Sequence, residues 1–460
     1  MTERQKLYTV GTLSYTTSAL VTLFFLLLLG DFAWQMKERS VFQIVQLMFK
    51  RHGASDMLNG FMIASLPSAI GLFLGPIISY RSDRCRSRLG RRIPYLLFTT
   101  PIAAGAMAGM AFSPMLGTWI STHLCGSADG VTLCFLGFFW AAFEFASAIA
   151  GALFGALIND VVPAKVLGRF YGLFRAISLV AGIIFNYWLF GYAEVHYMTL
   201  FLSIGALYAI GFFVMCLKVR EGKYPPPEDD AGHGGLYAIR SYFRECYSNS
   251  YYLLVFAMLF FAGLAFAPVN SFCMFYAQSL EIPMKHYGRF LAITYAISLV
   301  LAYGIGFLAD RFHPLRLGLP VLGLYGVMGC VAGFWIRGET SFGIAFVAHG
   351  VISGTFFTAT ASLQQRLFPR ASFAQFSSAC GIVYSLGYIV FIPLVGRFLD
   401  WTGHKYHYIY WIGAIAAFLA LGTGLIVHRC FMRLGGPAHY EPPPGIPENT
   451  WTTKPNPEEI

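Results

Sequence analysis

The chain has 460 residues, of which 57% are hydrophobic and only 12% are charged, and its formal net charge is +10. Soluble globular domains carry roughly 25% charged residues, so this composition excludes an ordinary soluble enzyme, a disordered protein and a nucleic-acid binder. A membrane-spanning helix needs about 20 apolar residues, and twelve such helices fit within this length. The composition therefore predicts an all-α polytopic protein that is embedded in the lipid bilayer.

Apolar runs separated by polar breaks predict twelve transmembrane helices. We expect them at residues 20–49, 57–80, 94–113, 131–158, 168–191, 197–217, 251–279, 288–309, 317–336, 341–364, 372–398 and 408–430. Residues 1–217 would form an N-terminal six-helix bundle and residues 251–432 a C-terminal one. Residues 218–250 would be a cytoplasmic central loop, and residues 433–460, rich in proline and charge, a disordered cytoplasmic tail.

The positions of the basic residues predict the orientation, because lysine and arginine accumulate in cytoplasmic loops. The loop between the second and third spans holds six arginines: Arg81, Arg84, Arg86, Arg88, Arg91 and Arg92. The N-terminal tail, with Arg4 and Lys6, is expected on the same side. Residues 20–49 must then cross the membrane once, which puts Asp31, Lys37 and Glu38 inside it. Both termini are predicted to be cytoplasmic.

An internal repeat relates the two halves. The stretch from Gly75 to Arg84 follows the second span, and a similar stretch from Gly304 to Arg311 follows the eighth. Matching breaks at matching ends of the helices indicate a duplication. Parallel repeats of six helices are typical of transporters in which two bundles rock around a central site.

The segment from Ser82 to Pro94 reads SDRCRSRLGRRIP. It resembles the loop signature of the major facilitator superfamily, and more narrowly that of the sucrose-transporter branch related to the glycoside–pentoside–hexuronide:cation symporters. The resemblance implies a secondary active transporter that imports a sugar or glycoside with protons by alternating access. It also implies a multi-pass protein of the cell (plasma or inner) membrane, expected to be a monomer with no cofactor.

The same loop is expected to act as a gate. Asp83 ends the second span, and the resemblance implies that it meets the N-terminus of the eleventh helix near residues 371–373, where an anionic group is favoured. Such a contact forms in one conformation only and biases the equilibrium between conformations. The alternative is that the arginines only fix the topology. The predicted gating residues are Gly75, Asp83, Arg84, Gly90, Arg91, Arg92, Asp310 and Arg311.

Charged residues inside the membrane are costly, and they are candidates for function by default. Asp31, Trp34, Gln35 and Glu38 share one face of the first helix at helical spacing. This face offers acid, aromatic and amide groups, which suit hydrogen bonding and stacking of a sugar. Lys37 and Arg39 lie on the same segment.

Two further ionisable residues are expected in the membrane, Glu144 in the fourth span and Arg175 in the fifth. The resemblance implies that Glu144 accepts the coupled proton and that Arg175 modulates it or binds substrate. Asp31 is the second candidate for proton coupling. The alternative is a structural ion-pair network that holds helices 1, 4 and 5 together. The melibiose-type cation symporters place carboxylates on their second helix to bind sodium, but residues 57–80 of this chain hold no acidic residue before Asp83. This departure from the related symporters leads us to expect H⁺ rather than Na⁺ as the coupling ion.

The second half contributes Asn270, Tyr276 and His349 as candidate substrate-binding residues, and Trp140 is added because it neighbours a buried acid. Two other functions stay open: a proton-driven antiporter that exports small amphipathic compounds, and a transport-inactive sensor with a transporter fold. A membrane enzyme is disfavoured, because the chain has no HExxH, GxSxG or P-loop pattern.

Overall fold

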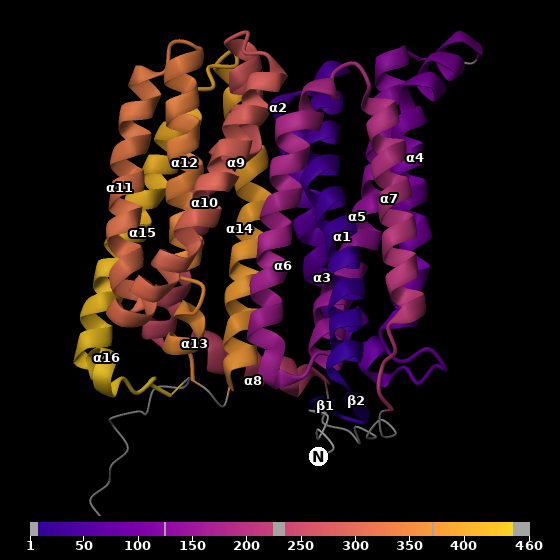
Figure 1. Cartoon of the computed structure of the whole chain (residues 1–460). Helices are drawn as coiled ribbons and strands as arrows, with labels where there is room; N and C mark the ends of the chain where they lie inside the picture. The colour runs from indigo at the N-terminus through magenta and orange to yellow at the C-terminus, as the bar shows by residue number, and fades with distance from the viewer. Residues whose placement is uncertain (1–7, 124–125, 224–234, 370–371, 445–460) are drawn as a thin grey trace, which may run out of the picture.

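The computed structural model describes residues 8–123, 126–223, 235–369 and 372–444. In these ranges 12 helices are long and apolar enough to cross a membrane. They stand side by side in two bundles, one from each half of the chain (Figure 1). The predicted all-α fold with twelve spans is confirmed. The only strands in the described ranges form a short hairpin before the first helix.

The first half begins with this hairpin, in which Tyr8 pairs with Tyr15. The Thr16 hydroxyl then accepts the Ala19 amide at 3.3 Å and caps the first helix. The elements of this half are β1 (Tyr8–Val10), β2 (Leu13–Tyr15), α1 (Thr17–Arg51), α2 (Asp56–Gly60), the π-helix η1 (Phe61–Ser65), α3 (Leu66–Arg84), α4 (Ile93–His123), α5 (Ala128–Val161), α6 (Ala164–Ile184), the π-helix η2 (Phe185–Leu189), the 3-10 helix η3 (Phe190–Tyr192) and α7 (Tyr197–Lys218).

The second half is preceded by a short amphipathic helix, α8, within the predicted central loop. Its elements are α8 (Gly235–Tyr247), α9 (Ser250–Ser279), α10 (Met284–Phe312), α11 (Pro314–Trp335), α12 (Glu339–Ala359), α13 (Leu363–Leu367), α14 (Phe373–Trp401), α15 (Tyr408–Arg433) and α16 (Gly436–His439). Where a span is made of several elements, as in α2–η1–α3, they run on as one membrane-crossing segment.

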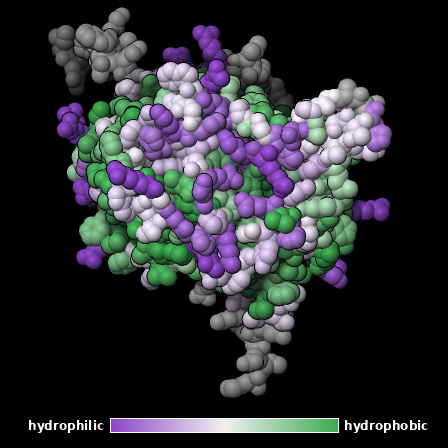
Figure 2. Space-filling view, turned by 90° about the horizontal axis from the view of Figure 1, so that it is seen from above, coloured by the Kyte–Doolittle hydropathy of each residue, from purple (hydrophilic) through white to green (hydrophobic). Residues whose placement is uncertain are grey.

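Both described chain ends lie at the same end of the molecule as the arginine-rich loop between α3 and α4 (Figure 1). We call this the basic end, and the other the opposite end. Seen from the opposite end, hydrophilic residues gather in the middle of the face and hydrophobic residues surround them (Figure 2). An apolar perimeter is the surface that a bilayer requires.

The two halves touch at the opposite end. There α14 packs against α2 and η1, and α10 packs against η2 and η3. Two glycines permit this approach: a Cβ atom at Gly396 would press on the Asp56 carbonyl, and one at Gly288 on the Asn186 carbonyl. Towards the basic end, Gly75 and Gly304 have no other atom within 4 Å of where a Cβ would lie. The structure is therefore closed at the opposite end.

The chain after α15 differs from the prediction of a disordered tail. The Tyr440 hydroxyl donates a hydrogen bond to the Leu367 carbonyl at 2.8 Å and lies 3.0 Å from the Tyr251 hydroxyl. The Tyr440 ring lies 4.9 Å from that of Phe431. Residues 436–444 thus pack on the basic end of the second half, because the Tyr440 ring contacts apolar side chains there. Residues 445–460 lie outside the described ranges.

Candidate functional site

A cavity of about 430 Å³ lies between the two halves. This volume is within the range of small-molecule binding sites. The first half contributes side chains from α1 and α6, and the second half from α9, α10 and α12. The polar lining includes Glu38, Arg39, Gln43, Gln46 and Arg175 on one side, and Asn270, Thr294, Tyr295, Ser298, His349, Ser353 and Thr358 on the other. Four of the nine predicted substrate-binding residues line it: Glu38, Arg175, Asn270 and His349.

Lys37 is fully buried, and α1 presents it to the interior of the first half. Its Nζ lies 2.8 Å from Glu38 Oε1, donates to Ser147 Oγ at 2.8 Å and sits 3.6 Å from the centre of the Trp34 ring. Glu144 lies one turn before Ser147 on α5, and its carboxyl group interacts electrostatically with Lys37 and Glu38. The structure thus gathers the charges of helices α1 and α5 around one lysine, as an ion-pair cluster requires.

Asp31 is also fully buried, one and a half turns before Lys37. Its Oδ1 accepts a hydrogen bond from Gln35 Nε2 at 3.1 Å, which is the spacing of adjacent turns on one helix face. Its Oδ2 has no hydrogen-bond partner among the described residues. A carboxylate oxygen that is buried without a donor is costly while it carries a charge.

A chain of hydrogen bonds leads from Asp31 to the cavity. The Ser178 hydroxyl on α6 donates to Gln35 Oε1 at 2.9 Å and accepts from Arg39 Nη2 at 3.0 Å. Arg39 Nη1 donates to the Tyr295 hydroxyl on α10 at 3.3 Å. Since α10 belongs to the second half, this chain joins a buried acid of one half to the other half across the cavity.

The second half faces the cavity with uncharged polar groups. His349 Nδ1 lies 2.9 Å from the Tyr325 hydroxyl, and its Nε2 lies 3.0 Å from Asn270 Oδ1. The imidazole is nearly fully buried and both ring nitrogens have partners. His349 therefore fixes the positions of Asn270 and Tyr325, and Asn270 presents its amide to the cavity.

The structure does not bring Trp140 or Tyr276 to the cavity. The Trp140 indole is fully buried in the first half, where it donates to the Met62 carbonyl at 2.7 Å and lies against Phe143 at 5.5 Å. Tyr276 is buried beside the Tyr406 and Tyr410 rings towards the opposite end. Trp34 serves as the ring beneath the Lys37 ammonium rather than as a cavity wall.

At the basic end, the predicted gating residues form an ion-pair cluster. Asp83 lies 2.5 Å from Arg92 Nη2 and 3.8 Å from Arg91 Nη1. Asp160, at the end of α5, pairs with the same two arginines at 3.3 and 2.6 Å. Glu221, after α7, accepts the backbone amides of residues 91, 92 and 93 at 2.8–2.9 Å and so caps α4.

The remaining gating residues are placed as follows. Gly90 has a φ of +113° and closes the tight turn of the loop. The Arg84 guanidinium stacks 3.6 Å from the Tyr80 ring, and that of Arg311 lies 5.5 Å from the Phe312 ring. The expected contact of Asp83 with the start of the eleventh helix falls partly on residues 370–371, which lie outside the described ranges. The side chain of Asp310 also lies outside them, so the gating role stays a prediction.

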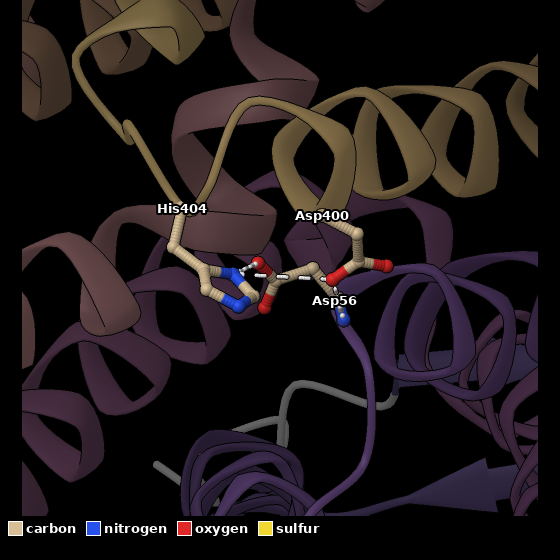
Figure 3. Close-up of side chains that lie close together, drawn as sticks. All are labelled: Asp56, Asp400 and His404. Carbon is tan, nitrogen blue, oxygen red and sulfur yellow. Dashed lines mark hydrogen bonds and ion pairs between the residues drawn. The ribbon is translucent and has the colours of Figure 1, made fainter.

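A second charged cluster seals the opposite end (Figure 3). Asp56, at the start of α2, is fully buried, and its carboxylate accepts from Lys50 Nζ at 2.6 Å, from the Tyr406 hydroxyl at 2.9 Å and from His404 Nδ1 at 2.7 Å. Asp400, at the end of α14, accepts the backbone amides of Asp56 at 2.9 Å and Met57 at 3.0 Å. We call these residues the outer lock, because they join α1 and α2 to the second half.

The outer lock also offers one ligand atom each from Asp56, Asp400 and His404 within 4.8 Å of one another. The Lys50 ammonium already neutralises the Asp56 carboxylate at 2.6 Å. This cluster is therefore complete as an ion-pair network, and the chemistry of its residues does not call for a metal ion.

Sequence reasoning missed the outer lock and the cavity face of α10. Asp56, Asp400 and His404 lie at helix ends, where charged residues are common in membrane proteins and do not indicate a functional site. Thr294, Tyr295 and Ser298 are common in membrane helices. Ser298 follows the other two by three and four residues, which places it one turn further along the same face, and this spacing is the one signal that could have pointed to them.

The comparisons with known proteins agree with this architecture. Residues 26–373 match a family model described as MFS/sugar transport protein. A structure of the xylose transporter XylE from E. coli is 13% identical, with a TM-score of 0.62, over 89% of this chain and 95% of that one. The nucleoside transporter NupG is 13% identical, with a TM-score of 0.60, over 88% and 98%.

A bacterial homologue of the iron transporter ferroportin is 17% identical, with a TM-score of 0.62, over 89% of this chain and 99% of that one. At these identities the structures show a shared fold. No curated protein matches the chain.

Proposed function

Because the chain belongs to the MFS/sugar transport protein family, we propose that it is a proton-coupled symporter of a sugar or glycoside that works by alternating access. The chain is a multi-pass membrane transport protein with a small-molecule cavity between its halves. The basic end would face the cytoplasm, so the structure would represent an inward-facing state. The amide and hydroxyl groups of the cavity support a polyhydroxylated substrate more than an amphipathic one.

The observation that carries the proposal is the hydrogen-bond chain from Asp31 to Arg39 and Tyr295. A proton on the unpartnered Asp31 Oδ2 would remove a buried charge that no described donor compensates. Arg39 lines the cavity, so substrate bound there would act on Asp31 through Gln35 and Ser178. Proton uptake and substrate binding would thereby be linked.

Glu144 is the second candidate for the coupled proton. It lies beside the Lys37–Glu38 pair rather than at the cavity wall. We propose H⁺ rather than Na⁺ as the coupling ion, because sodium requires several hard oxygen ligands and residues 57–82 of α2, η1 and α3 contain no carboxylate.

The test is counterflow and uphill uptake of radiolabelled sugars by the purified protein in liposomes, with and without a pH gradient. We expect exchange of at least one sugar, and accumulation only when the lumen is alkaline relative to the medium. Asp31→Asn should retain exchange and lose pH-driven accumulation. Glu144→Gln is measured in the same way, and the acid whose loss uncouples transport is the proton carrier.

The matched control is Asp129→Asn, because Asp129 is an exposed acid at the opposite end whose partner is His52. This variant should transport like the wild type. Absence of sugar exchange at every pH would refute the proposal. Accumulation driven by an inward sodium gradient, with none driven by protons, would refute the choice of coupling ion.

A further inference from the structure

We infer that an anionic phospholipid binds at the basic end of the seam between α11 and α15, with its phosphate at Arg316 and His428. The two helices pack against each other, and α11 stands at the outer edge of the second half (Figure 1). The inference concerns the membrane-facing surface of the protein and not the cavity between the halves. It therefore does not depend on the proposed substrate or on the coupling ion.

The carboxylates and arginines of the two helices are unequally distributed. Neither α11 nor α15 contains an aspartate or a glutamate, and their arginines, Arg316, Arg429 and Arg433, are exposed in the turns nearest the basic end. Among the described residues, none of the three arginines forms an ion pair with a carboxylate. The nearest acids along the chain are Asp310, whose side chain lies outside the described ranges, and Glu441, which is exposed and has no ion pair within those ranges. The two helices thus do not neutralise their own positive charge.

The Arg316 guanidinium reaches from α11 to α15. Its Nη2 donates to Met432 Sδ at 3.3 Å, and a thioether is a weak acceptor without charge. His428 lies one turn before Met432 and interacts electrostatically with Arg316. Its Nδ1 has no hydrogen-bond partner among the described residues. Two side chains from two helices therefore offer hydrogen-bonding nitrogens at one point of the seam, and charge-assisted bonds to phosphate oxygens suit such a pair.

The start of α11 adds to the positive potential at this point. His313 caps this helix and is buried. Burial, together with the charges of Arg366, Arg316 and His428, lowers the pKa of His313 to about 4. The same charges that disfavour a proton on His313 favour an anion close by. The N-terminus of a helix favours an anion as well.

Beyond these charges the seam is apolar and exposed. On α11, Pro320 and Leu324 follow Arg316 at intervals of four residues and so continue the same face. On α15, Leu425 precedes His428 by three residues. All three apolar side chains are exposed. The rise from Arg316 to Leu324 is about 12 Å, which fits within the roughly 15 Å of hydrocarbon in one leaflet.

This sequence of groups matches a phospholipid better than a free anion. The phosphate would lie at the level of Arg316, and the acyl chains would cover the apolar part of the seam. Basic sites between membrane helices on the cytoplasmic side are known to hold anionic headgroups. A zwitterionic phospholipid fits less well, because its ammonium group would be repelled by the same arginines.

The experiment is native mass spectrometry of the full-length protein in detergent, with phosphatidylglycerol and phosphatidylcholine of identical acyl chains at equal concentration. We expect one phosphatidylglycerol to be retained with at least fivefold higher affinity than phosphatidylcholine, and excess inorganic phosphate not to displace it. Arg316→Gln should lower the affinity for phosphatidylglycerol about fivefold, which is the contribution expected of one basic residue at an anionic headgroup. Arg316→Lys keeps the charge and should lose less.

The matched control is Arg220→Gln, because Arg220 is an exposed arginine at the basic end of the first half, directly after α7. This variant should bind phosphatidylglycerol like the wild type. Thermal unfolding shows which variants are folded, and Arg316→Lys and His428→Asn decide where Arg316→Gln is not.

Three results would overturn the inference. Equal affinity for the two lipids would show that the seam does not select an anion. Equal losses in the Arg316 and Arg220 variants would show a general attraction to the basic end and no site at the seam. Displacement of the lipid by inorganic phosphate would show a site for a free anion. None of these measurements requires transport, so their outcome leaves the proposed function untouched.

Discussion

The outer lock makes a measurable prediction about the conformational equilibrium. The Asp400 carboxylate of the second half accepts two amides at the start of α2 in the first half, at 2.9 and 3.0 Å. Because these bonds join the two halves at the opposite end, they would break if this end opened. We expect Asp400→Asn to favour the conformation in which this end is open, because the amide side chain keeps one acceptor oxygen and loses the charge.

The size of the effect follows from the contacts. A hydrogen bond to a charged group contributes about 1.5–3 kcal/mol, and an anion at a helix N-terminus about 0.3–1 kcal/mol. Asparagine retains one neutral bond, and removing the charge relieves some repulsion from Asp56. A net loss of about 1–2 kcal/mol remains, which is roughly a fivefold to thirtyfold change in the ratio of closed to open molecules.

The assay is the rate at which a maleimide labels a cysteine placed at Ser65. This residue is buried where η1 meets α14, and its hydroxyl donates to the Ile389 carbonyl. Cys134, which is exposed, is replaced by serine in the background. Asp400→Asn should speed labelling fivefold to thirtyfold, whereas Asp129→Asn should not. A rate within twofold of the parent, in a folded protein, would show that these bonds do not hold the end closed.

Three other predictions concern single contacts. Ser178→Ala leaves Gln35 Oε1 without its donor and should raise the KM for substrate about tenfold, measured by counterflow. Glu221→Gln weakens the cap of three amides at the start of α4 and should lower the free energy of unfolding by about 1–2 kcal/mol. The measurement is a lower thermal unfolding temperature in detergent. Burial, with two arginines and a histidine nearby, lowers the pKa of His313 from 6.5 to about 4. As the pH falls, His313 therefore takes up a proton in the unfolded chain before it does so in the folded protein. The free energy of unfolding should fall by on the order of 1 kcal/mol per pH unit below 6.5. In His313→Asn, which keeps the cap and tolerates the φ of 75°, this slope should flatten in thermal unfolding from pH 4.5 to 7.

Each of these has its own control. Ser178→Thr keeps the hydroxyl and should behave like the wild type, and an equal loss in both variants would contradict the role of the hydrogen bond. Glu194→Gln removes a charge from the loop before α7 and should not change the unfolding temperature. The His313 reasoning fails if wild type and variant show the same pH slope.

The sequence alone predicted the twelve spans and the single long first helix. The single first helix follows from the basic residues, which place both the N-terminal tail and the arginine-rich loop in the cytoplasm. Two segments on the same side of a membrane must be separated by an even number of crossings. The helix α1 indeed runs unbroken from Thr17 to Arg51 with Asp31 and Lys37 fully buried. Solvation physics leaves little choice here, so sequence reasoning succeeds.

The partners of these charges could not be predicted in the same way. Trp140 was expected at the site because it neighbours an acid in sequence, yet its indole points into the first half and bonds to the Met62 carbonyl. A helix that is apolar on all sides gives no sign of which face meets which neighbour. The outer lock joins Asp56 to Asp400 across 344 residues, a pairing that only the packed bundle specifies.

The seal at the opposite end rests on peptide groups at two places. Gly396 of α14 lies against the Asp56 carbonyl, and Gly288 of α10 lies against the Asn186 carbonyl. Each of these two contacts joins the second half to the first. Backbone atoms have no rotamers to choose among, so the depth of approach is set by the helices alone. In a cycle of opening and closing, such surfaces would meet in the same register each time, and the outer lock would reassemble without a search among side-chain conformations.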